Sequence, residues 1–327
     1  MFPDWLRIIL LILTFLSFRP QLHRICARND ASGIALSYIL LNLIAATEQF
    51  ALNFGYTALD MPSDGGFVHK SRTVGDWLDL AQTTLVWVLF VAYFALCLSF
   101  PSESTLRHRK IMLGVYLAYF FITIIPLFIA AVIMGSYDNK GSWNDLPAMF
   151  VFIPHMLWLN YIGTILVVVA IYVQARAILR ARPGPDPSEP ESEVPATSEP
   201  ESESAQEVQG QEEVYPYQKH TPTSLSVPGL AAQSVLFIIL AVSWIFRVSS
   251  PPVPEGATWW DYRVLRDWFE LVGSVAVDNA VFGIGQGILL LIVLRSGKKG
   301  WGEELGEQEE GEGALGTERE PLLARAM

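Results

Sequence analysis

The sequence predicts an all-α, polytopic membrane protein with seven transmembrane helices. Its composition supports this, because 51% of the residues are hydrophobic and only 17% are charged, which fits a membrane chain better than a soluble domain. Seven apolar stretches also recur, at residues 2–18, 36–52, 80–100, 111–135, 149–174, 230–246 and 271–294. Roughly 17–25 apolar residues cross a bilayer, so the first stretch is marginal and the others are adequate. A signal-peptide core is the alternative for the first, although no small-x-small cleavage site follows it.

The net charge of −11 belongs to two segments outside the apolar body. Residues 183–218 hold ten acidic residues and no basic ones, and residues 301–327 hold eight acidic residues against two basic ones. The loop 183–222 and the tail 296–327 are too poor in apolar residues to fold, so we predict that both are disordered. The chain lacks the basic surface that nucleic-acid binding requires. Its histidines show no metal-ligand spacing, so neither a metal nor a cofactor is expected.

Lysines and arginines alternate from loop to loop. They cluster after the first, third, fifth and seventh apolar stretches, whereas aspartates dilute them on the opposite side. By the positive-inside rule, the N-terminus faces the lumen or exterior and the C-terminus faces the cytosol. An odd number of helices requires the same split.

The two halves of the sequence repeat each other. Residues 170–174 mirror residues 17–21, with Val173 in place of Pro20, and residues 267–271 match residues 76–80. We therefore predict two parallel three-helix repeats joined by one helix, a 3+1+3 plan. Its parts are a first repeat in residues 1–100, a linker helix in 101–146, a second repeat in 147–295 that the acidic loop 183–222 interrupts, and a cytosolic tail in 296–327.

The most specific pattern runs from Phe18 to Asn42. An apolar run meets Pro20 and Gln21, and a basic patch, a polar turn ending at Gly33 and a second apolar run follow. This order resembles the PQ-loop family, in which a Pro-Gln pair closes one membrane helix and an S-x-G-[IL] turn opens the next. The family includes cystinosin, the vacuolar and lysosomal cationic amino-acid exporters and, more distantly, the SWEET sugar transporters. Gln174 would then belong to a degenerate second motif.

The resemblance implies a transporter whose substrate site lies between the repeats near the bilayer midplane. Pro20, Gln21 and Gln174 would act as hinges, because proline frees backbone carbonyls and lets half-helices move. Asn42 occupies a position where the family pattern also carries an asparagine, so it would contact the substrate. Five residues earlier, where family transporters often place an aspartate for proton coupling, this chain has Ser37. That departure argues against cystinosin-like proton symport through this helix.

Polar residues inside apolar stretches are costly and usually face the interior of a bundle. We expect Asn42, Asn160, Asp278 and Asn279 to line a substrate site. Asp278 lies too deep in its helix to be interfacial, and a purely structural carboxylate is the alternative. Glu48 lies near the luminal end, where it either serves a function or simply reaches water.

The tail carries a pattern that resembles the acidic dileucine sorting signal, [DE]-x-x-x-L-[LI]. Glu318, Leu322 and Leu323 occupy its fixed positions. Adaptor complexes read this signal on cytosolic tails of proteins bound for vacuoles or lysosomes. We therefore expect a vacuolar or lysosomal membrane protein and a sorting adaptor as a partner.

Three functions remain open at this point. The first is a transporter of a small polar solute, most plausibly an amino acid, that works by alternating access. The second is a membrane-embedded terpene cyclase of a fungal terpenoid pathway, in which Glu48 and Asp278 would protonate the substrate and stabilise cations. The third is a non-transporting receptor or scaffold. The sequence favours no particular oligomeric state.

Overall fold

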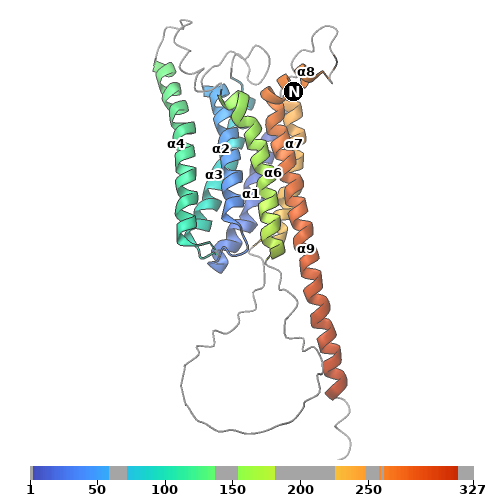
Figure 1. The fold of residues 1–327 in the computed structure, drawn as a ribbon. Coiled ribbons are helices and arrows are strands. Elements are labelled where there is room, and N and C mark those ends of the chain that lie inside the picture. Colours follow the sequence, from blue (N-terminus) through green and yellow to red (C-terminus); the bar gives the residue numbers. More distant parts are fainter. Residues whose placement is uncertain are drawn as a thin grey trace, which may run out of the picture.

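The computed structural model describes residues 3–58, 72–102, 104–136, 154–180, 225–247, 258 and 261–315. The acidic loop 183–222 and the sorting residues Glu318, Leu322 and Leu323 lie outside the described residues. The described part is helical throughout (Figure 1). Its long helices are α1 (Asp4–Arg28), α2 (Leu36–Ala58), α3 (Val74–Ser99), α4 (Leu106–Ser136), α6 (Asn160–Arg180), α7 (Val227–Arg247) and α9 (Ser274–Leu315). Shorter elements are α8 (Tyr262–Trp268) and two π-helical turns, η1 (His155–Leu159) and η2 (Phe269–Gly273).

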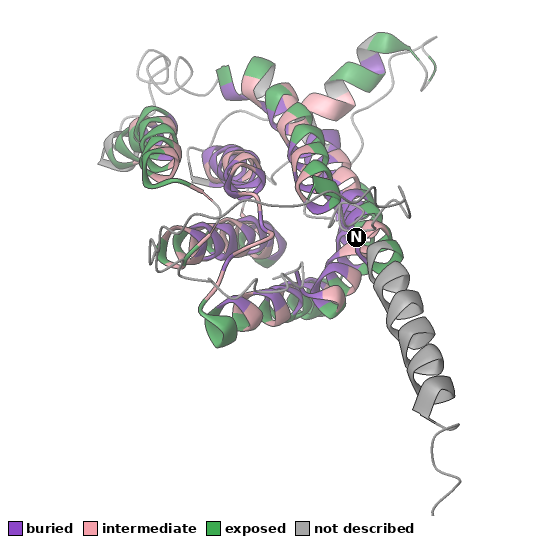
Figure 2. Cartoon of the chain, turned by 60° about the horizontal axis from the view of Figure 1, so that its bottom comes forward, coloured by how far each residue is buried: buried purple, intermediate pink, exposed green. Residues whose placement is uncertain are grey.

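Six of the described helices are long and apolar enough to cross a membrane, namely α1, α3, α4, α6, α7 and α9 as far as Arg295. The chain is therefore a multi-pass helical membrane protein, as predicted. α2 is absent from this set because its 23 residues include Asn42, Glu48, Gln49 and Asn53. It packs against α3, α4 and α6 and is buried along most of its length (Figure 2). Polar side chains are tolerated there because they face protein rather than lipid.

The helices pack as two similar units. α3 packs between α1 and α2, and α9 packs between α6 and α7. The units meet along two seams, one between α2 and α6 and the other between α1 and α7. These six helices form a ring, and α4 lies outside it against α2, at the left of Figures 1 and 2. Most of the apolar side chains of α4 are exposed, as expected for a helix that faces lipid.

The sequence pattern implied that the first helix ends at the Pro-Gln pair. In the structure, α1 runs past this pair. It continues through Pro20 to Arg28 and ends at Asn29, which has a left-handed backbone with φ of 51°. Ile25 is completely buried in this extension, so packing stabilises the turns that follow the proline. Gly33, with φ of 76°, completes the turn into α2.

α9 also runs further than its apolar stretch, which ends at residue 294. The helix continues to Leu315, so residues 296–315 are helical where we predicted a disordered tail. Adding a residue to an existing helix costs far less than starting one. The six glutamates of this segment favour the helix, whereas its six glycines oppose it.

Candidate substrate site

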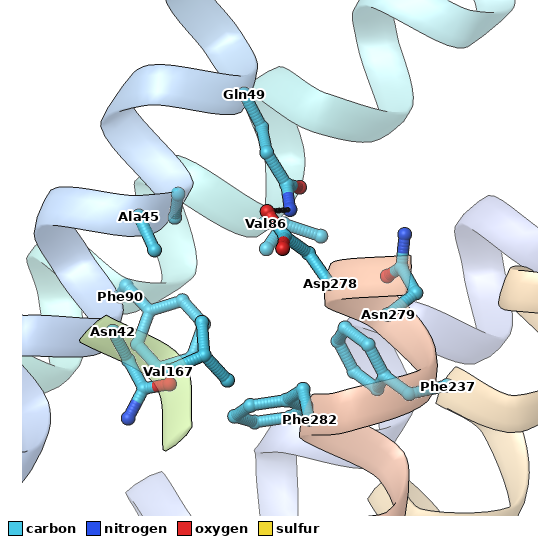
Figure 3. Close-up of a pocket in the computed structure, with 11 residues that line it drawn as sticks. Asn42, Ala45, Gln49, Val86, Phe90, Val167, Phe237, Asp278, Asn279 and Phe282 are labelled. Atoms are coloured by element: carbon cyan, nitrogen blue, oxygen red, sulfur yellow. Dashed lines mark hydrogen bonds between the residues drawn. The ribbon is translucent and has the colours of Figure 1, made fainter. Parts of the chain in front are cut away.

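A small cavity lies between the two units, at the centre of the ring (Figure 3). Its volume is about 20 Å³, which holds about one water molecule. Helices α2, α3, α6, α7 and α9 supply its lining, which consists of Asn42, Ala45, Ala46, Gln49, Val86, Phe90, Val167, Phe237, Asp278, Asn279 and Phe282. The structure therefore brings together three of the four residues that we expected to line a substrate site: Asn42, Asp278 and Asn279.

Asp278 is the acidic group of this cavity, and it is 3% exposed. Its carboxylate accepts a hydrogen bond of 2.9 Å from Nε2 of Gln49 and another from the hydroxyl of Thr164 (Figure 3 draws the first). Among the described residues, no lysine, arginine or histidine forms an ion pair with it. Sequence reasoning missed both donors. The only signals were their spacings, since Gln49 directly follows Glu48 and Thr164 lies four residues after Asn160.

The two asparagines of the cavity are held in a fixed orientation. Nδ2 of Asn42 donates to the carbonyl of Tyr38 at 2.8 Å, and Nδ2 of Asn279 donates to the carbonyl of Val275 at 2.7 Å. A backbone carbonyl only accepts hydrogen bonds, so each amide nitrogen must face its own helix. Each side-chain oxygen therefore points the other way. Oδ1 of Asn42 is buried and has no hydrogen-bond partner among the described residues.

Four phenylalanines pack beneath Asp278. Phe18 of α1 meets Phe90 edge to face at 5.3 Å between ring centroids and Phe237 at 6.2 Å. Phe282 packs against Phe90 at 5.7 Å and against Phe237 at 4.5 Å. Three of these rings, Phe90, Phe237 and Phe282, line the cavity itself (Figure 3). The site therefore combines a carboxylate and amide oxygens with an aromatic wall.

Asn160, the fourth expected residue, does not line this cavity. It is buried where η1 passes into α6, and its Nδ2 has no partner among the described residues. Its backbone carbonyl accepts a weak contact of 3.5 Å from the hydroxyl of Thr164, which also donates to Asp278. Among the described residues, Thr164 is thus the link between Asn160 and the site.

Glu48 forms a separate buried cluster, and it is only 2% exposed. Its Oε1 lies 2.7 Å from Nδ1 of His155, and its Oε2 accepts a hydrogen bond of 2.8 Å from the hydroxyl of Tyr119. The cluster joins α2 to η1 and α4. Glu48 therefore does not reach water, which was one of the two roles that we considered for it.

Gln21 and Gln174 tie the two units together. Gln174 of α6 donates to the carbonyl of Gly33 and accepts from the amide of Ala35, both at 2.9 Å, just before α2 begins. Gln21 of α1 accepts from the amide of Ser226 at 2.7 Å, just before α7 begins. Each glutamine thus binds the start of a helix in the other unit. In this structure the predicted hinge residues hold the seams closed, while Pro20 lies inside α1.

A buried ion network binds other segments of the helices. Asp79 of α3 accepts from Arg7 of α1 at 2.7 Å and from Arg247 of α7 at 2.8 Å. Arg7 also donates to the carbonyl of Gly75 at 2.7 Å. Sequence reasoning did not single out either arginine, because nothing local indicated that they share a carboxylate.

No protein-family model matches the chain, and neither a curated protein nor a solved structure matches it. Within the described part, no group of three or more histidine, cysteine or acidic side chains could hold a metal ion. A small, acidic and partly aromatic cavity between two similar helical units can take up a small polar solute once the units move apart.

Proposed function

We propose that the chain is a transporter that moves a small polar solute across a membrane by alternating access. One observation carries the proposal. The cavity lies between two units whose three helices pack in the same order, with Asn42 from one unit and Asp278 from the other on its wall. Substrate sites at the interface of structural repeats are typical of transporters.

In this proposal α2 is a seventh membrane span, and the chain follows the 3+1+3 plan. The units α1–α3 and α6–α9 are parallel repeats, and α4 is the linker helix. The spacing of corresponding positions in the two halves supports the repeat. Ala35 precedes α2 and Ser226 precedes α7, and these two residues are separated by the same number of residues as Asp76 and Asp267. The hydrogen bonds of Gln21 and Gln174 support the repeat as well, because each glutamine binds the turn before a helix of the other unit. Membership of the PQ-loop family belongs to the same proposal.

Alternating access requires the two units to move relative to each other, and the size of the cavity implies such a movement. About 20 Å³ is too small for a solute of several heavy atoms, so the units must separate before a solute enters. The glutamine ties hold the seams where α2 and α7 begin, and the ion network of Asp79 holds α1, α3 and α7 where α3 begins and α7 ends. If either the glutamine hydrogen bonds or the ion network of Asp79 were released while the other stayed intact, the cavity would open to one side of the membrane at a time.

The location of the transporter is proposed from the sequence. The charge pattern favours a luminal N-terminus and a cytosolic C-terminus, and the dileucine pattern favours a vacuolar or lysosomal membrane with a sorting adaptor as a partner. Replacing Leu322 and Leu323 by alanine would then redirect the protein to another membrane. Unchanged localisation of that variant in cells would refute the sorting role.

Uptake by proteoliposomes tests the proposal. Purified full-length protein is reconstituted with and without a pH gradient and offered labelled amino acids, amines and sugars, one at a time. We expect saturable uptake of at least one solute, with loss of that uptake in Asp278→Asn. Glu270→Gln is the matched control, because it also turns a carboxylate into an amide but lies outside the cavity, beside Tyr161 and Arg266.

The cyclase hypothesis is the second candidate, and one observation favours it. Glu48 and Asp278 are both buried, and the cavity phenylalanines could stabilise a carbocation. Folded protein that takes up none of the solutes but converts an epoxidised prenyl substrate to a cyclic product would establish the cyclase and refute the transporter.

A further inference from the structure

Asp278 differs from the other two deeply buried carboxylates described above. Glu48 has His155 beside it, and Asp79 has two arginines. Asp278 has only neutral donors, Gln49 and Thr164. A buried carboxylate without a positive partner is unfavourable. Of the three, the carboxylate in the cavity is therefore the one whose charge no described side chain balances.

The amide oxygens of the cavity are hydrogen-bond acceptors. The amide nitrogens of Asn42 and Asn279 bond to their own helices, so both residues offer their oxygens, and that of Asn42 has no partner among the described residues. The amide nitrogen of Gln49 is engaged by Asp278. Two amide oxygens and a carboxylate thus match the three N–H donors of a primary ammonium group.

The apolar part of the lining favours the same kind of ligand. Phe90, Phe237 and Phe282 supply aromatic rings beside these acceptors. A cation over the face of an aromatic ring is attracted by the quadrupole of the ring, most strongly when water is excluded. An anion gains nothing comparable from this wall.

A solute carboxylate would have no cationic partner in this cavity. None of the residues that line it is lysine, arginine or histidine, and Asp278 would repel a second negative charge. Like charges placed together in a binding site weaken binding. An amino acid, the solute that the sequence resemblance favoured, therefore matches the cavity with its amino group and not with its carboxylate.

We infer that this cavity binds a small primary amine that carries no carboxylate, and that Asp278, Asn42 and Asn279 hold its ammonium group. The inference rests on the proposed transport function and narrows its substrate class from polar solutes to amines. The same cavity would reject the amino acid from which such an amine is formed by decarboxylation.

Ethanolamine and serine test this inference, because they differ only in the carboxylate. Binding of each to purified full-length protein is measured by titration calorimetry, and uptake of each is measured in proteoliposomes. We expect ethanolamine to bind saturably and serine to bind at least tenfold more weakly. Asp278→Asn should weaken ethanolamine binding at least tenfold, while Glu270→Gln should not change it. Size-exclusion profiles and unfolding temperatures confirm that both variants are folded.

The outcomes separate the two proposals. Serine that binds as tightly as ethanolamine overturns the inference. If serine is also taken up in a way that depends on Asp278, the proposed transport function still holds. Ethanolamine binding that is unchanged in Asp278→Asn also overturns the inference. Absence of ethanolamine binding to folded protein overturns it as well. Ethanolamine that binds through Asp278 but is never taken up supports the inference about the cavity and refutes transport.

Discussion

Replacing Asp79 by asparagine perturbs the buried ion network with almost no change of shape. It leaves the side chains of Arg7 and Arg247, which are 9% and 0% exposed, without the carboxylate that lies between them. Removing one partner of a buried ion pair costs about 3–5 kcal/mol, because the remaining charge stays buried without compensation. For a chain of this size, about 2–4 °C of unfolding temperature corresponds to each kcal/mol. We therefore expect Asp79→Asn to lower that temperature by about 6–20 °C.

Glu270→Gln is the matched control, because Glu270 occupies the corresponding place in the motif of the second half. Its side chain is 18% exposed, and its contacts are longer: 3.2 Å from the hydroxyl of Tyr161 and 3.7 Å from Nε of Arg266. An ion pair of this kind contributes about 0–1 kcal/mol. Thermal unfolding of both variants in detergent, followed by tryptophan fluorescence, makes the comparison.

A second substitution sharpens the test of the ion network. Adding Arg247→Met to Asp79→Asn removes one of the two stranded charges, so part of the lost stability should return. Equal and small shifts for Asp79→Asn and Glu270→Gln would refute the reasoning. They would mean that the carboxylate of Asp79 does not hold α1, α3 and α7 together.

The remaining predictions concern the seams and the second acidic cluster. Gln174→Ala removes both hydrogen bonds to the turn before α2 and should cost about 1–3 kcal/mol in thermal unfolding; an unchanged unfolding temperature would contradict this. Gly283→Ala would place a Cβ 3.0 Å from the backbone nitrogen of Ile238 and should cost about 1–3 kcal/mol, whereas Gly163→Ala meets nothing within 4 Å and should leave stability unchanged or raise it. Glu48→Ala should cost about 1–3 kcal/mol by leaving the buried His155 and the half-buried Tyr119 without this partner, and stability equal to that of the original chain would exclude this role.

The sequence could predict the helical class, because membrane helices must satisfy their backbone internally and therefore appear as long apolar stretches. It also predicted that Asn42, Asp278 and Asn279 face the interior of the bundle, because polar side chains at that depth are costly when they face lipid. The end of α1 could not be predicted in the same way. The helix passes through Pro20 because the buried packing of Ile25 outweighs the local signal.

The partners of the polar residues depend on packing between distant helices. Thr164 and Gln49 are ordinary helical residues until α6, α2 and α9 bring them to Asp278. Arg7 and Arg247 lie near helix ends, where arginines usually face water or lipid head groups, so their shared carboxylate had no local sign. The same holds for Gln174, whose role as a tie between units depends on where the turn at Gly33 lies.

Accessibility of the cavity from the two sides of the membrane tests alternating access most directly. A single cysteine is placed at Ala45 on the cavity wall, in a background in which Cys26 and Cys97 are replaced by serine. The protein is reconstituted in vesicles, and a membrane-impermeant thiol reagent is applied to one side at a time. A cysteine at Ile122, which is 75% exposed on α4, is the lipid-facing control and should not react. We predict that the cysteine at position 45 reacts from either side, and reaction from only one side, or from neither, would contradict alternating access.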